Sequence, residues 1–151
     1  MADIREIVKE GDPILRQKAV TVRRFDERLG RLLDDMAKTM KYAEGCGLAA
    51  PQVGISKRII VCYDEDVIYE FVNPVIVSHG NTKVTEAEGC LSVPDVRGLV
   101  SRYKSIKVKA QDRNGEEFER DIEGWLARIV QHEVDHLEGR LFTDIMTKKV
   151  D

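Results

Sequence analysis

The stretch QHEVDHLEG, residues 131–139, contains two histidines four positions apart, with a glutamate directly after the first. It belongs to a segment with helical periodicity from about Gly124 to Glu138, the last clear element of the chain. Residues i and i+4 lie on one face of a helix, so His132 and His136 point in the same direction. Histidines at this spacing can bind one metal ion together, and a neighbouring glutamate can act on its bound water.

The same periodicity divides this helix into three stripes, and we expect the histidines to lie on a buried one. The polar stripe consists of Arg128, Gln131, Asp135 and Glu138. The apolar stripe consists of Leu126, Val130 and Leu137. The third stripe is also largely apolar and consists of Trp125, Ile129, His132 and His136.

A catalytic metal site needs a third protein ligand, and the residues after His136 do not supply one. One familiar arrangement places a further histidine six positions on, where this chain has Phe142. Another uses a glutamate well downstream, but Glu138 is the only glutamate after His136. The upstream candidates are one histidine and three cysteines, namely His79, Cys46, Cys62 and Cys90.

Among these candidates, Cys90 has the best local chemistry for a ligand. A glycine precedes it and frees the backbone, and Glu88 and Ser92 can orient a bound group. We expect His79 in a solvent-facing turn and Cys62 in the core of an apolar strand. On local chemistry alone, a small buried cysteine and two ordinary helix histidines are the competing interpretation.

Length and composition indicate one soluble globular domain. The 151 residues are 42% hydrophobic and 34% charged. The net charge of -3 gives no sign of nucleic-acid binding, and the apolar runs are too short to cross a bilayer. The charged N-terminus lacks the apolar core of a signal peptide, so we expect a cytoplasmic protein. The odd count of three cysteines argues against a disulfide framework.

The order of expected elements indicates an α+β fold. They are an amphipathic helix over 26–43 capped by Asp26, strands over 57–63, 67–74, 105–112 and 116–122, and the helix over 124–138. The Asn-Gly pair within 113–115 predicts a hairpin between the last two strands. We therefore expect mixed, mainly antiparallel β-sheets around a C-terminal metal-binding helix, with an N-terminal amphipathic helix.

Three motifs resemble the signature motifs of the peptide deformylase family. They are GCGLAAPQ (45–52), EGCLS (88–92) and QHEVDH (131–136). They occur in the family's order and at family-like separations, and the resemblance covers nearly the whole chain. Three motifs in register are far more specific than any one of them alone. The resemblance implies a single catalytic domain over residues 1–151.

The resemblance also implies the site and the reaction. It implies one divalent ion with water in its fourth position and three protein ligands, namely Cys90, His132 and His136. Glu133 is then the acid/base rather than a ligand, and Gln52 and the backbone N–H of Leu91 stabilise the oxyanion. The implied reaction removes the formyl group from the formyl-methionine start of new polypeptides and releases formate, a step of protein biosynthesis.

The metal and the partners are also expected from the resemblance. One thiolate and two imidazoles suit zinc or ferrous iron. The resemblance favours Fe²⁺, with Zn²⁺ or Ni²⁺ as replacements. It implies N-formyl-Met nascent peptides as substrates and the ribosome near the exit tunnel as a partner. Some relatives carry a longer C-terminal helix than the tail that ends at Asp151. The resemblance therefore does not extend to a ribosome contact through that helix.

Three further residues and one glycine-containing segment give specific hypotheses. Trp125 and Ile129 precede His132 by whole helical turns and could line an apolar pocket for the methionine side chain. The alternative places them in the core, which we favour for Trp125. The Gly45–Gly47 segment could pair with the peptide backbone. Arg102 could pair with Glu88 and brace the Cys90 loop, or it could be an exposed strand charge.

Position 46 departs from the family pattern, which usually has an aliphatic residue there. We interpret Cys46 as a small hydrophobic residue, with an oxidation-prone thiol or a fourth ligand as the alternatives. A fourth ligand, Cys46 or His79, would produce a closed structural metal module without catalysis. That hypothesis leaves Glu133 and Gln52 unexplained. A general metallopeptidase is the other rival, and the missing downstream ligand counts against it.

Overall fold

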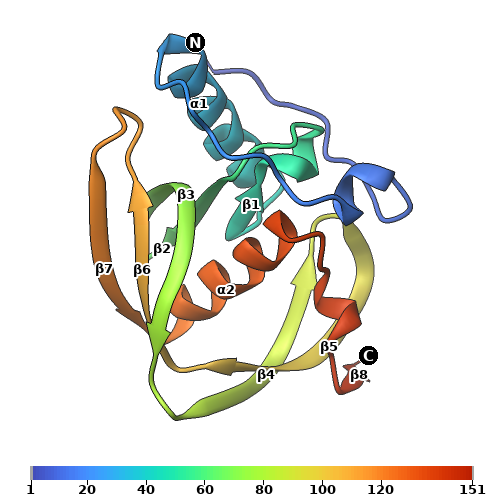
Figure 1. Ribbon diagram of the computed structural model, residues 1–151. Coiled ribbons are helices and arrows are strands. Elements are labelled where there is room, and N and C mark those ends of the chain that lie inside the picture. Colours follow the sequence, from blue (N-terminus) through green and yellow to red (C-terminus); the bar gives the residue numbers. More distant parts are fainter. Residues whose placement is uncertain (1, 151) are drawn as a thin grey trace.

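Two β-sheets and two long helices make up the computed structural model, which describes residues 2–150 (Figure 1). The helices are α1 (Glu27–Tyr42) and α2 (Trp125–Leu137). Three short 3₁₀ helices connect the larger elements, at Pro13–Arg16, Ala50–Val53 and Phe142–Asp144. No helix within residues 2–150 combines the length and the apolar character that crossing a membrane requires.

The larger sheet has five strands in the order β1-β2-β3-β6-β7. These strands are β1 (Gly47–Ala49), β2 (Ile59–Asp64), β3 (Val67–His79), β6 (Ser105–Gln111) and β7 (Glu117–Glu123). The smaller sheet, β4-β5-β8, consists of β4 (Lys83–Cys90), β5 (Val93–Tyr103) and β8 (Lys148–Val150). Every pairing of these named strands is antiparallel, which confirms the expected α+β fold with mainly antiparallel sheets.

Strand β2 is buried on both faces because a helix packs on each side of the larger sheet. Ile59 and Val61 belong to the apolar cluster that contains the buried face of α1. Ile60 and Cys62 alternate with them and belong to the cluster that contains the apolar face of α2. Side chains of successive strand residues point to opposite faces, so one apolar run joins both helices to the sheet.

Helix α2 lies between the two sheets (Figure 1). Its apolar residues pack on the larger sheet, and contacts with β5 join it to the smaller one. The expected polar stripe is therefore only partly solvent-exposed, since Arg128 and Gln131 are buried. Gln131 compensates by accepting a hydrogen bond from the Tyr103 backbone N–H and donating one to the Tyr103 carbonyl oxygen.

Several expected elements are confirmed by the structure. Asp26 caps α1 by accepting hydrogen bonds from the backbone N–H groups of Arg28 and Leu29. The hairpin at 113–115 joins β6 to β7, with Gly115 at a φ of 86° in the left-handed region.

Other parts of the strand prediction were wrong or incomplete. Strand β3 continues to His79, which is exposed as expected but ends a strand and stacks on Tyr103 at 3.6 Å between ring centroids. Strands β4 and β5 were not predicted. Their segments are rich in charged residues, and β4 is an edge strand, so they lack the apolar alternation that marks a half-buried strand.

Candidate metal centre

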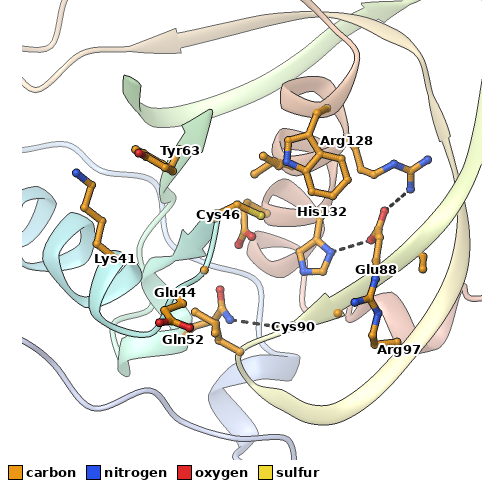
Figure 2. A pocket seen from close by; sticks show the side chains of 18 residues that line it. Lys41, Glu44, Cys46, Gln52, Tyr63, Glu88, Cys90, Arg97, Arg128 and His132 are labelled. Atoms are coloured by element: carbon orange, nitrogen blue, oxygen red, sulfur yellow. Dashed lines mark hydrogen bonds and ion pairs between the residues drawn. The ribbon is translucent and has the colours of Figure 1, made fainter. Parts of the chain in front are cut away.

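Three side chains with metal-binding atoms converge where the end of β4 meets α2. They are Cys90, His132 and His136, and their potential ligand atoms all lie within 4.8 Å of one another. Cys90 Sγ lies 3.3 Å from His136 Nε2. Both histidines are buried and Cys90 is half-buried. Figure 2 shows Cys90 and His132 at the wall of a pocket.

An irregularity in strand pairing directs Cys90 toward the helix. The pairing of β4 with β5 changes register between Glu88 and Cys90, and Cys90 then pairs with Val93. Irregularities of this kind bend a strand and re-aim its side chains. The thiol therefore leaves the regular alternation of β4 and meets the two histidines of α2.

The hydrogen bond of His132 and the lowered pKa of His136 suit metal binding. His132 Nδ1 lies 2.8 Å from Glu88 Oε1, so an Nδ1–H donated to this carboxylate leaves Nε2 free to bind an ion. Burial lowers the pKa of His136 well below its usual range, which favours its neutral imidazole. A neutral imidazole is the state that binds a metal.

The donor set fits a divalent ion with an open coordination position. One thiolate and two imidazoles are typical ligands of zinc and ferrous iron, and three protein ligands characterise catalytic sites. Within residues 2–150, no fourth histidine, cysteine or acidic residue joins this group. Cys46 and His79 both lie outside it, which argues against the closed structural module.

An open cavity of about 770 Å³ lies next to the convergent side chains. Trp125 and Ile129 both line it, as their helical phase predicts. Ile129 is buried, whereas Trp125 is 46% exposed, so the core interpretation that we favoured for Trp125 was wrong. Cys46 also lines the cavity. The pKa of its thiol is raised to about 11, mainly by burial and to a smaller extent by the charge of Glu133.

Gln52 is buried beside the cysteine and its amide is oriented by two neighbours. Its Oε1 accepts a hydrogen bond from the Ala49 N–H at 2.9 Å. Its Nε2 donates to Ser92 Oγ at 3.1 Å and lies 3.5 Å from Cys90 Sγ (Figure 2). The fixed Oε1 contact therefore places the amide nitrogen on the side of Ser92 and Cys90.

Glu133 is a buried carboxyl group at the cavity, and one of its oxygens is unpaired. Its Oε1 makes no hydrogen bond within residues 2–150. Burial raises the pKa of Glu133 to about 7, against the opposing effect of the His132 charge. A Cβ atom added to Gly47 would lie 2.5 Å from Glu133 Oε2, so only glycine leaves space for this carboxylate.

Glu88 connects this centre to two buried arginines. Arg102 makes a two-pronged ion pair with it, which confirms the predicted pairing. Arg128 also pairs with it, and this contact was not predicted because periodicity alone placed Arg128 with polar surface residues. Burial would raise the pKa of Glu88, but hydrogen bonds with His132 and Arg102 outweigh it and lower the pKa to about 2.

Comparisons with known proteins agree with this geometry. The polypeptide deformylase family model matches residues 4–151. A peptide deformylase of Heliobacterium modesticaldum is 51% identical over 141 residues, which cover 93% of each chain. The crystal structure of the Thermotoga maritima peptide deformylase has a TM-score of 0.94 at 42% identity, covering 95% of this chain and 98% of that one.

A further solved structure is that of a class I type b peptide deformylase from Acinetobacter baumannii with Met-Ala-Ser bound. Its TM-score is 0.93 at 40% identity, and the match covers 97% of this chain and 100% of that chain. The agreement thus extends over sequence and fold along almost the entire length. The chain belongs to the polypeptide deformylase family.

Proposed function

We propose that residues 1–151 act as one catalytic domain in which Cys90, His132 and His136 hold the single divalent ion that the family implies. The reaction removes the formyl group from the formyl-methionine start of nascent polypeptides and releases formate. The observation that carries this proposal is the convergence of the three ligand atoms within 4.8 Å, next to an open cavity. Buried Glu133 and Gln52 line the same cavity.

The donor set supports Fe²⁺ as the resident ion, with Zn²⁺ or Ni²⁺ as replacements. A thiolate together with two imidazoles suits these borderline ions better than Mg²⁺ or Ca²⁺, which prefer oxygen ligands. When bound, the ion supplies Lewis acidity and lowers the pKa of water toward neutrality.

Glu133 then acts as the general base and acid. Its carboxylate takes a proton from water as the water oxygen attacks the formyl carbon. The carboxyl group returns that proton to the leaving amine nitrogen as the carbon–nitrogen bond breaks. Burial in the cavity wall raises the pKa of Glu133 above its usual range, which favours a carboxyl group that can accept the proton and then donate it.

Gln52 and Leu91 stabilise the charge that develops on the formyl oxygen. Gln52 Nε2 is a neutral amide donor, held beside Cys90 by the contact that fixes Oε1. The backbone N–H of Leu91 follows directly after the ligand cysteine in the chain. Removing one such donor typically lowers the rate roughly a hundredfold or more.

Substrate binding uses the rest of the cavity. We assign the methionine side chain to the part lined by Ile129 and Trp125, and the peptide backbone to the Gly45–Gly47 segment. The Acinetobacter baumannii relative with Met-Ala-Ser bound supports a peptide that begins with methionine. Because the substrate is a newly made polypeptide, we place the reaction in the cytoplasm, near the ribosomal exit tunnel.

The test is an assay of formate release from formyl-Met-Ala after anaerobic purification and metal analysis. Wild type and Glu133→Ala are compared at equal metal occupancy. We expect the variant to lose roughly 10²- to 10⁴-fold in kcat, the usual contribution of a general base. A metal-loaded wild type without formate release would overturn the proposal, and cleavage of unformylated internal peptide bonds would favour a general metallopeptidase.

A further inference from the structure

Glu88 lies beside the metal centre and accepts hydrogen bonds at both of its oxygens. Arg102 Nε donates to Oε2 at 3.0 Å and Arg102 Nη2 donates to Oε1 at 2.9 Å. Arg128 Nη1 donates to Oε2 at 2.5 Å, and His132 Nδ1 lies 2.8 Å from Oε1. The side chain of Glu88 is only 4% exposed, so these four contacts take the place of water.

Arg128 is itself held from three directions. Besides Glu88, it donates Nη1 to the carbonyl oxygen of Val100 in β5 at 2.9 Å. It also donates Nη2 to the carbonyl oxygen of Val84 in β4 at 2.5 Å. A planar guanidinium can make these contacts together, whereas a lysine ammonium is a point charge on a flexible stem. Arg128 therefore ties α2 to both neighbouring strands of the smaller sheet.

The consequence reaches His132 through the carboxylate. Two guanidinium groups favour the ionised form of Glu88, and an ionised carboxylate can only accept hydrogen bonds. His132 must then donate from Nδ1, which leaves Nε2 as the lone-pair atom and fixes the orientation of the ring. Figure 2 shows this sequence of contacts from Arg128 through Glu88 to His132.

We propose that Arg128 is a positioning residue for the metal centre, which holds Glu88 so that this carboxylate keeps His132 Nε2 directed at the ion. The inference rests on the metal ligands of the proposed function and adds a residue that lines the same cavity but lies outside the ligand group. Groups that orient metal ligands typically change metal affinity by roughly 10- to 100-fold when they are removed. Arg128 acts one contact further out, through Glu88.

The experiment measures the Zn²⁺ affinity of the full chain by competition with a chromophoric chelator, well below the unfolding temperature. We expect Arg128→Met to weaken Zn²⁺ binding by roughly tenfold or more. Arg128→Lys keeps the charge and should recover part of that loss. The control for the loss of an arginine with two acceptors is Arg113→Met, because Arg113 bonds two carboxylates, Asp34 and Glu70, away from the cavity.

Three readouts separate positioning from a purely structural role. A structural role would lower the unfolding temperature of the metal-free variant but leave the affinity of the folded molecules unchanged. In a double-mutant cycle, Arg128→Met should weaken Zn²⁺ binding only slightly when Glu88→Gln is already present, because the carboxylate that connects Arg128 to His132 is then absent. The Co²⁺ absorption spectrum should change in Arg128→Met and stay unchanged in Arg113→Met.

Each outcome decides the proposal. Zn²⁺ affinity of Arg128→Met within twofold of wild type would overturn it, and so would full additivity in the cycle. If Arg128→Met does not fold, the Zn²⁺ affinity of Arg128→Lys is measured instead. An affinity of Arg128→Lys within twofold of wild type would then overturn the inference. A wild type that binds Zn²⁺ without releasing formate contradicts the proposed function alone, whereas a wild type without Zn²⁺ affinity contradicts both.

Discussion

Helices α1 and α2 pack on opposite faces of the same sheet, yet they bury different kinds of side chain. The buried residues of α1 are mainly leucine and methionine, with Asp35 and Thr39 as the polar exceptions. The buried residues of α2 include Arg128, His132 and Glu133. The difference follows from their surroundings, since α1 has water on its outer side and α2 has a second sheet.

The charge clusters at the two helices show the same contrast. Arg113 bonds Asp34 of α1 and Glu70 of β3, and these side chains are 24% to 55% exposed. Glu88 bonds Arg102 and Arg128, and these side chains are 4% to 6% exposed. An exposed cluster contributes little to stability because water competes for each charge. A buried cluster must remain complete, because a lone buried charge has no substitute partner.

Glu88→Gln should give the largest effect, because it removes the buried carboxylate shared by two arginines, so that Arg102 keeps only Asp135 as an ion-pair partner and Arg128 keeps only the partly exposed Glu86. We expect a loss of about 3–5 kcal/mol in the free energy of unfolding at pH 7. Chemical denaturation of the metal-free protein measures it. A loss under about 1 kcal/mol would show that the buried cluster behaves like an exposed one.

The same variant has a defined pH dependence. The pKa of Glu88 is lowered to about 2 in the folded protein, below the value of about 4.3 in an unfolded chain. The stability that this shift contributes is complete above the unfolded pKa and is lost as pH falls through the folded pKa. The difference between wild type and Glu88→Gln should therefore shrink from about pH 4 to about pH 2.

Gly47→Ala should give the second largest effect, because the added methyl group would meet Glu133 Oε2 at 2.5 Å and Ile129 Cγ2 at 2.8 Å. We expect kcat to fall roughly a hundredfold, since small displacements of a catalytic group have effects of this size. Steady-state assays at equal metal content measure it. Wild-type kcat would show that Glu133 can move without loss of function.

Glu70→Gln tests the exposed cluster beside α1. Because Glu70 and Arg113 are partly solvated, we expect a loss of about 1 kcal/mol or less, decreasing further at high salt. Denaturation at low and high ionic strength provides the measurement. A loss as large as that of Glu88→Gln would remove the distinction between the two clusters.

Gly30→Ala should give the smallest effect, and it should stabilise the protein. Gly30 lies inside α1, and an added Cβ would meet Arg113 Nη1 at an ordinary 3.5 Å. Alanine is preferred to glycine in a helix interior by roughly 0.5–1 kcal/mol. A small rise in unfolding temperature with unchanged kcat is expected. Lower stability would show that the packing around α1 cannot accommodate the added methyl group, despite the ordinary distance to Arg113 Nη1.

Features that depend on neighbouring residues could be predicted from the amino-acid sequence. The cap at Asp26, the hairpin at 113–115 and the helical phase that aligns His132 with His136 all follow from local rules. The three motifs also identified the family, because their order and separation are properties of the chain.

Contacts between residues that are far apart in the sequence could be identified only from the folded structure. Arg128 and Glu88 are 40 positions apart, and helical periodicity cannot show that a polar stripe faces a buried carboxylate. Strand β4 lacks an apolar alternation, so its register shift and the direction of Cys90 depend on pairing with β5. Periodicity describes the faces of one element, whereas long-range partners are set by the packing of α2 between two sheets.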